Sequence, residues 1–316
     1  MKLNWWSLLL IATAMGTFLT AISSGSRFGW TSPYIFTLFF TAACCLAAFL
    51  LVEFTTATPL LQMRLFRIRT FTISVIVGFI FGAGMFGSLY VLPIFAQTVL
   101  GYTAFKAGLL LMITGLMMIP TFPIGGRLAQ QPRSGIPIAI GMLMFGGSSI
   151  ALAGADANAA FWFVAAWATF GRIGLSIAMP SLQTGAMREL PAELLPYGVG
   201  TMNFVRMTGA AGTNALAIVL DHRLIHHADA LAATQTDGNG YTQDLLQQVA
   251  ALLIDYGITA AERMPMAVEY LSRVIVVQAN SLAFRDGFTL LAFGFLLAAL
   301  SALALAGKPR SALSSP

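Results

Sequence analysis

The chain has 316 residues, of which 58% are hydrophobic and only 9% are charged, and its mean hydropathy is +0.81. Soluble domains carry about 25% charged residues, so this composition excludes an ordinary soluble domain. The formal net charge of +5 does not call for a nucleic-acid partner, because basic residues collect in the cytoplasmic loops of membrane proteins. We therefore expect an all-α polytopic membrane protein whose main partner is the lipid bilayer.

Eight apolar runs are long enough to cross a bilayer as helices. They are 5–23, 34–53, 71–95, 107–125, 136–154, 160–182, 199–220 and 287–306. The first run could be read as a signal peptide with a cleavage site at Ala21-Ile-Ser23. It begins with Trp5 and Trp6, which suit an interfacial anchor, so we favour a retained helix.

The distribution of Lys and Arg predicts the orientation of these spans. With the N-terminus inside, the inner segments carry nine basic residues: Lys2, Arg64, Arg67, Arg69, Arg127, Arg133, Arg188, Lys308 and Arg310. The short outer loops carry only Arg27 and Lys106. Both termini are then cytoplasmic, and the long loop 221–286 is extracytoplasmic.

The loop 221–286 differs in character from the spans, since it holds eight of the twelve acids and all three histidines. Its apolar residues predict an amphipathic helix near 245–253 and a second helix from about Met266 towards the last span. We expect a surface cap. His226, His227 and Asp229 form a weak cluster, but adjacent histidines on a helix point in different directions, so no metal site is expected.

The seventh apolar run, 199–220, contains the strongest functional signal, Arg206, with Asn203 and Asn214 on the same segment. A guanidinium at membrane depth is costly, and such residues face a bundle interior, a cavity or a partner charge. Arg206 therefore either lines a central cavity or ties helices together through backbone carbonyls, and the sequence leaves both open. Arg172, in the middle of its span, is a second cation at depth, and we expect Arg172 and Asn203 to lie near Arg206 if Arg206 lines a central cavity.

Other polar residues in the spans give weaker signals. Tyr90 and Gln97 lie in the third run, and Gln97 suits the membrane interface better than a ligand site. No Asp or Glu lies in the middle of any predicted span, although a proton-coupled transporter usually needs a carboxylate at depth. No catalytic motif stands out, so we expect neither an enzyme nor a cofactor.

Two stretches in the first half carry a resemblance to a known family. Tyr90-Val-Leu-Pro-Ile-Phe-Ala-Gln through Gly108, followed by Pro120 and Gly125-Gly-Arg-Leu128, resembles the fourteen-helix drug:proton antiporters of the major facilitator superfamily (EmrB/QacA type). The run 59–71 is similar to the loop before the ninth helix of that family.

The resemblance continues at both ends of the chain. The stretch 203–206 with Gly209 and Gly212 resembles the thirteenth helix, and the start through Trp30 is similar to the seventh. Almost the whole chain is covered, but only by the last eight helices of the family. Gln130-Gln131 and Arg172 depart from the family pattern, which usually has an acid and a base in that loop and a small or apolar residue in place of Arg172.

The resemblance implies a division into residues 1–58, two linker-type helices, and 59–316, a six-helix C-terminal half. It implies multidrug efflux of small amphipathic or hydrophobic solutes, driven by the proton gradient, in a bacterial inner membrane. The first six helices, which carry the proton-coupling acid, have no counterpart here, so a truncated transporter is expected. Two alternatives stay open: a non-transporting scaffold or relic, and one subunit of a split transporter whose other half, or an efflux adaptor, is a separate chain.

Overall fold

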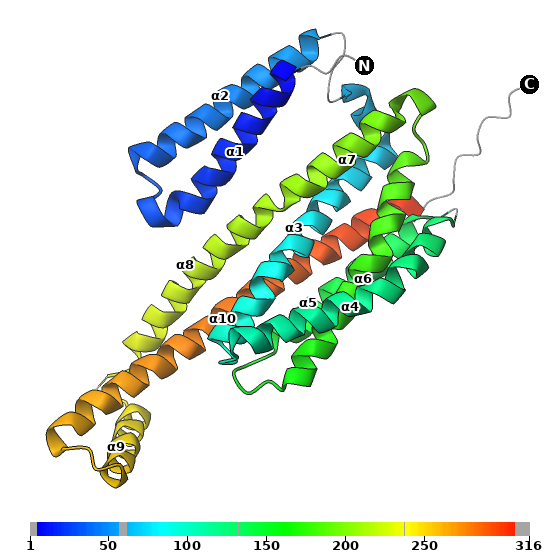
Figure 1. Ribbon diagram of the computed structural model, residues 1–316. Coiled ribbons are helices and arrows are strands. Elements are labelled where there is room, and N and C mark those ends of the chain that lie inside the picture. The colour runs from blue at the N-terminus through cyan, green and yellow to red at the C-terminus, as the bar shows by residue number, and fades with distance from the viewer. Residues whose placement is uncertain (1–4, 57–61, 132, 237, 307–316) are drawn as a thin grey trace, which may run out of the picture.

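The computed structural model describes residues 5–56, 62–131, 133–236 and 238–306, which form helices joined by short connections (Figure 1). The α-helices are α1 (Trp5–Phe28), α2 (Pro33–Thr55), α3 (Arg69–Thr98), α4 (Ala104–Ala129), α5 (Gly135–Ala153), α6 (Phe161–Met187), α7 (Leu195–Gly209), α8 (Ala211–Ala233), α9 (Gly240–Asp255) and α10 (Ala260–Leu303). Three short 3-10 helices are η1 (Met63–Arg67), η2 (Ala192–Leu194) and η3 (Ala304–Ala306). No strand occurs in these ranges, which confirms the predicted all-α fold.

Local signals in the sequence explain why the helices begin where they do. The Ser32 hydroxyl accepts the backbone N–H of Ile35 at 3.3 Å, and Pro33 follows in the first turn of α2. The Thr103 hydroxyl caps α4 in the same way. Gly101 has φ +64° in the turn before α4, a conformation that glycine adopts without strain. These tight connections make sequence neighbours antiparallel.

The helices form a bundle with two appendages (Figure 1). The bundle consists of α3, α4, α5, α6, α7 and the second part of α10. The α1–α2 hairpin lies beside α8. The end of α8 and the first part of α10 run together beyond the bundle, with α9 folded back on α10 at the far end, and we call this region the helical extension (residues 221–286).

Two apolar clusters hold the bundle together, one near each end. In the first, the Phe145 and Phe295 rings of α5 and α10 lie with centroids 4.2 Å apart. In the second, the Phe95 ring of α3 packs edge-on against Phe284 and Phe288 of α10, at 5.5 and 5.6 Å. The last part of α10 therefore forms the spine against which α3 and α5 pack.

Seven helices in the described ranges are long and apolar enough to span a membrane, and they match seven of the eight predicted runs. The exception is the run 199–220, which is divided at Ala210 into α7 and α8. Glycines on either side of the break, Gly209 and Gly212, weaken helix propagation. They also press against α3, where added Cβ atoms would meet the Phe79 carbonyl oxygen and the Ala83 side chain.

We expected residues 221–286 to form a loop that caps the surface of the bundle, and the structure differs from this expectation. Its described residues are mainly helical, and they project away from the bundle (Figure 1). The predicted amphipathic helix near 245–253 is confirmed as part of α9, and the helix expected from Met266 begins at Ala260 and continues unbroken into the last span. A single helix of 44 residues is far longer than the roughly 20 residues that cross a bilayer.

Candidate transport site

Arg206 and Asn203 lie one turn apart on α7 and contact each other. The Arg206 Nη2 donates to Asn203 Oδ1 at 3.0 Å, and both side chains are half-buried. A guanidinium has five N–H donors, so this single bond leaves most of its donors available. Three ion pairs, Arg223–Asp286, His227–Asp286 and Arg273–Glu269, lie in the extension, and Arg206 is in none of them.

The backbone around Arg206 is fixed by close contact with α3. A Cβ at Gly82 would collide with the Arg206 carbonyl oxygen, and a Cβ at Gly209 would collide with the Phe79 carbonyl oxygen. Small residues on facing helices allow this approach, as is common in membranes. Because α7 cannot slide along α3, the starting point of the Arg206 side chain is well defined.

The space beside Arg206 is small. Arg206 lines a cavity of about 10 Å³ together with Phe81 of α3, Gln183 of α6 and Met202 of α7. That is room for about one water molecule and not for an organic solute. The cavity that Arg206 helps to line is therefore too small to hold a drug-sized solute.

Arg172 is buried on α6, with 5% of its surface exposed, as its position in the middle of the span predicts. It lines a separate cavity of about 20 Å³ with Ser88, Ser148 and Ser149. The three serine hydroxyls donate to backbone carbonyls, at 3.0, 2.7 and 3.0 Å. Their oxygens keep lone pairs for other donors, yet the Arg172 Nη2 has no hydrogen-bond partner among the residues that the structure describes.

The two deep arginines do not share a site, contrary to the expectation that Arg172 lies near Arg206. Gln183, which lines the Arg206 cavity, is eleven residues beyond Arg172 on α6, about 16 Å at 1.5 Å per residue. Arg172 faces the interior between α3, α5 and α10, whereas Arg206 lies where α7 meets α3 and α6. Sequence spacing alone could not separate them, because each is simply a cation at depth.

The remaining candidates are scattered around the bundle. Tyr90 of α3 is 41% exposed. Gln97 is exposed near the end of α3, where its Nε2 donates to the Pro93 carbonyl at 3.1 Å, in keeping with an interfacial position. Asn214 is half-buried on α8, next to Thr213, whose buried hydroxyl has no partner among the described residues. Of the candidate residues predicted from the sequence, Asn203 is the one whose hydrogen bond to the Arg206 side chain is found in the described part of the chain.

One arrangement considered for Arg206 is a guanidinium that joins helices by donating hydrogen bonds to backbone carbonyls. The structure shows this arrangement at Arg188 instead. The Arg188 Nη1 donates to the Gln131 carbonyl at 2.7 Å, and its Nη2 lies 3.4 and 3.3 Å from the carbonyls of Ala129 and Gln130. It therefore joins the end of α6 to the end of α4. Sequence reasoning counted Arg188 only as a loop charge, and nothing in its spacing pointed to these carbonyls.

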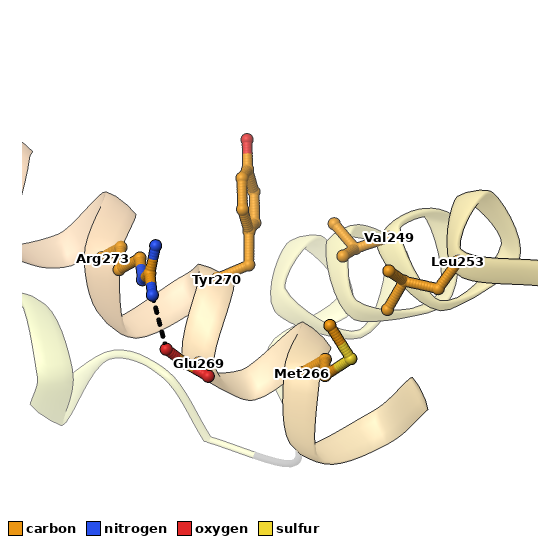
Figure 2. A pocket seen from close by; sticks show the side chains of 6 residues that line it. All are labelled: Val249, Leu253, Met266, Glu269, Tyr270 and Arg273. Atoms are coloured by element: carbon orange, nitrogen blue, oxygen red, sulfur yellow. Dashed lines mark hydrogen bonds and ion pairs between the residues drawn. The ribbon is translucent and has the colours of Figure 1, made fainter. Parts of the chain in front are cut away.

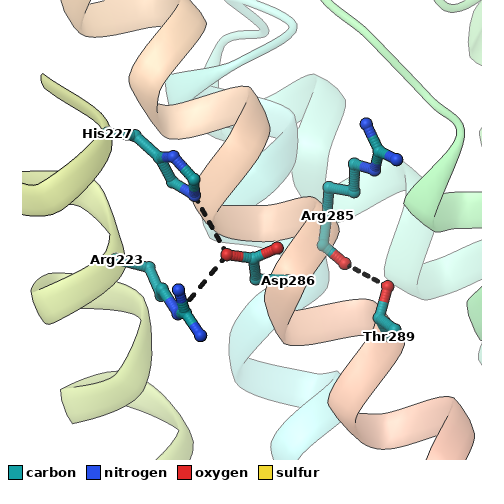
Figure 3. Close-up of polar contacts among 5 residues, drawn as sticks. All are labelled: Arg223, His227, Arg285, Asp286 and Thr289. Atoms are coloured by element: carbon teal, nitrogen blue, oxygen red, sulfur yellow. Dashed lines mark hydrogen bonds and ion pairs between the residues drawn. The ribbon is translucent and has the colours of Figure 1, made fainter. Parts of the chain in front are cut away.

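A polar cluster joins α8 to α10 at the base of the extension (Figure 3). Asp286 of α10 accepts His227 Nε2 at 3.0 Å and lies 3.4 Å from Arg223 Nε, both on α8. His227 thus has an acidic partner far away in the sequence, and it is not grouped with Asp229 around a metal position. The spacing of Arg223 and His227, four residues on one helix, was the signal that both face the same neighbour.

The extension also contains an open cavity of about 220 Å³ between α9 and α10 (Figure 2). Val249, Leu253 and Met266 form its apolar side, and Tyr270 stands at its edge. The Arg273 guanidinium bonds Glu269 at 2.7 Å on the same helix. None of the arginines in the bundle lines this cavity.

The comparison with known proteins agrees with this architecture. A model of the Major Facilitator Superfamily matches residues 5–213, more than half of the chain. The chain belongs to the Major Facilitator Superfamily. It is therefore a multi-pass membrane protein of a transporter family, in agreement with the exclusion of an enzyme.

Relatives within the superfamily are bacterial transporters and resistance proteins. The chain is 23% identical to the uncharacterized MFS-type transporter YhcA of Bacillus subtilis over 91% of its own length and 54% of that protein. It is 29% identical to the multidrug transporter protein MdtP of Bacillus subtilis, over 68% and 42%. The colistin resistance protein EmrB of Acinetobacter baumannii is 25% identical over 92% and 57%. The chain spans about half the length of these relatives.

Proposed function

We propose that this chain is the C-terminal part of a fourteen-helix, EmrB/QacA-type drug:proton antiporter that exports small amphipathic or hydrophobic solutes. The observation that carries the proposal is Arg206, a half-buried cation in the broken helix α7–α8 whose only side-chain partner in the described residues is Asn203. A charge at membrane depth that has no counter-ion in its own bundle is expected to face a binding site. We infer that Arg206 forms one side of this site and that a second helical bundle forms the other side.

The architecture of the family explains how a residue on one side of the site could take part in transport. Two halves rock about a central site, and residues at the interface of the halves contact the solute in both states. Helices α3 to α7 contain no Asp or Glu, so the proton-carrying carboxylate is assigned to the opposite half. The proton gradient supplies the energy, and the role of Arg206 is to bias the protonation of that carboxylate or to hold the solute.

The division of the chain follows from the same proposal. Helices α1 and α2 (within residues 1–58) act as the two linker helices, and residues 59–316 form the six-helix half, with α7 and α8 together serving as one crossing. The extension is then extracytoplasmic and both termini are cytoplasmic, in a bacterial inner membrane. A separate N-terminal half or an efflux adaptor would be the protein partner.

The test is replacement of Arg206 by alanine in a transport-competent assembly, with drug efflux measured in inverted vesicles. We expect at least about a tenfold loss of efflux, because a charge-assisted contact contributes about 1.5–3 kcal/mol. The matched control is Arg273→Ala, which removes the same side chain from an exposed ion pair in the extension. Normal efflux by the Arg206 variant at normal expression would refute the role of Arg206.

Autonomous transport is tested with this chain alone. Resistance conferred by the chain without a second half would contradict a site formed by two bundles. If it confers none, the neighbouring upstream coding sequence distinguishes the remaining possibilities. A reading frame for six spans with a deep Asp or Glu favours a split or longer transporter, whereas its absence favours the scaffold or relic.

A further inference from the structure

A cavity of about 490 Å³ lies outside the candidate transport site. It is formed where α5 ends and α10 passes, and its polar lining comes from Asp156, Gln278, Ser281, Arg285 and Thr289. The volume lies within the roughly 300–1,000 Å³ typical of small-molecule sites. Nothing in the transport proposal uses this cavity.

The cavity holds one cation and one anion that do not pair with each other. Arg285 is exposed and takes part in no side-chain hydrogen bond or ion pair within the described ranges. Its guanidinium points away from the neighbouring Asp286–His227 cluster (Figure 3). Asp156 accepts only the backbone N–H of Asn158, at 3.0 Å, from within its own turn. Both charges are therefore free to meet complementary charges on a ligand.

The position of the cavity along the bundle is that of a membrane–water interface. It lies level with the end of α5 and the start of α6, where Trp162 is 72% exposed. Exposed tryptophan side chains at helix ends mark the headgroup level of membrane proteins.

The apolar side of the cavity continues onto the surface that faces lipid. Ile150 of α5 lines the cavity and is 55% exposed. One turn beyond Thr289, Phe293 of α10 is 60% exposed on the same face of the helix. A ligand with a charged head and an apolar tail can thus place its head between Arg285 and Asp156 and its tail against Ile150 and Phe293.

We propose that this cavity binds the zwitterionic headgroup of an aminophospholipid of the phosphatidylethanolamine class. The Arg285 guanidinium donates to the phosphate, for which its planar fork is well suited. Asp156 accepts N–H donors from the primary ammonium. The Asp156 carboxylate disfavours a purely anionic headgroup, and a choline headgroup lacks the N–H donors that the carboxylate would bind.

The experiment measures lipid binding to the purified, delipidated full chain by native mass spectrometry. Phosphatidylethanolamine, phosphatidylcholine and phosphatidylglycerol with identical acyl chains are titrated separately. We expect the ethanolamine lipid to bind most tightly. Arg285→Gln should weaken its binding by about tenfold or more, since hydrogen bonds between charged groups contribute about 1.5–3 kcal/mol. Arg285→Lys should retain part of the affinity, and Asp156→Asn should remove the preference for ethanolamine over glycerol.

Arg273→Gln is the matched control, because it removes the same charge from the same helix outside the cavity, and its binding should equal that of the unmodified chain. Circular dichroism checks that each variant keeps its helix content. Equal binding of the three lipids, or unchanged binding by Arg285→Gln, would overturn the site. Soluble phosphoethanolamine or inorganic phosphate binding as tightly as the lipid would overturn the assignment to a membrane lipid.

Discussion

Replacing Arg172 by methionine is expected to stabilise the folded bundle. The guanidinium is 5% exposed, its Nη2 has no partner among the described residues, and its cavity of about 20 Å³ holds at most one or two waters. An unsatisfied buried donor costs about 1–3 kcal/mol, and more when it is charged. Methionine keeps an unbranched apolar stem and fills irregular gaps, so most packing contacts survive.

The size of this stabilisation depends on how well the Arg172 side chain is solvated in the unfolded state. In detergent the unfolded chain lets Arg172 reach water, so the desolvation penalty falls almost wholly on the folded state. We expect Arg172→Met to raise the free energy of unfolding by about 1–3 kcal/mol, which is the cost of an unsatisfied buried donor. The sign agrees with the stabilisation often found when buried charged groups are replaced by well-packed apolar residues. Arg172→Ala should gain less, because it enlarges the cavity.

The assay is equilibrium unfolding of the purified chain by sodium dodecyl sulfate in mixed micelles, followed by circular dichroism. Arg172→Met and Arg172→Ala are compared with the unmodified chain at the same micelle composition. If the free energy of unfolding of Arg172→Met is lower than that of the unmodified chain by more than about 1 kcal/mol, the reasoning is refuted. It would mean that the guanidinium has a favourable partner, such as a bound anion or ordered water linked to the three serines.

Two further predictions concern helix contacts. Gly82→Leu should destabilise the bundle by about 1–3 kcal/mol or more, because its Cβ would meet the Arg206 carbonyl oxygen, whereas Gly16→Leu, which has open space around it, should change the same unfolding curve little. Arg188→Ala should lower the free energy of unfolding by about 0.5–1.5 kcal/mol, because it removes the 2.7 Å hydrogen bond from an exposed side chain to the Gln131 carbonyl. Cross-linking between α4 and α6 should also become less efficient. Unchanged unfolding and cross-linking would show that this bond contributes nothing.

Much of the fold could be predicted from the sequence because membrane helices must satisfy their own backbone hydrogen bonds. Seven predicted spans correspond to long apolar helices, and the amphipathic pattern near Leu253 placed α9 correctly. The errors lie where polarity and glycine interrupt the pattern. The run 199–220 is divided at Ala210, and the loop before the last span is an extension of α8 and α10.

The candidate site was predicted less completely than the fold. Asn203 was correctly expected beside Arg206, because residues three apart on a helix are neighbours. Arg172 looked like a second member of the same site, but it faces a different interior. The charges of Arg285 and Asp156 gave no signal in the sequence, because they are 129 residues apart and belong to different elements.

The sequence by itself determined that this protein is a helical membrane protein of a transporter family and that two arginines, Arg172 and Arg206, lie within its apolar runs. Composition, apolar length and motif order depend on local chemistry, so they can be read along the chain. The tertiary structure decided which charges meet. It joined His227 to Asp286, separated Arg172 from Arg206, and pressed α7 against Gly82, because the direction of a side chain depends on helix rotation and packing.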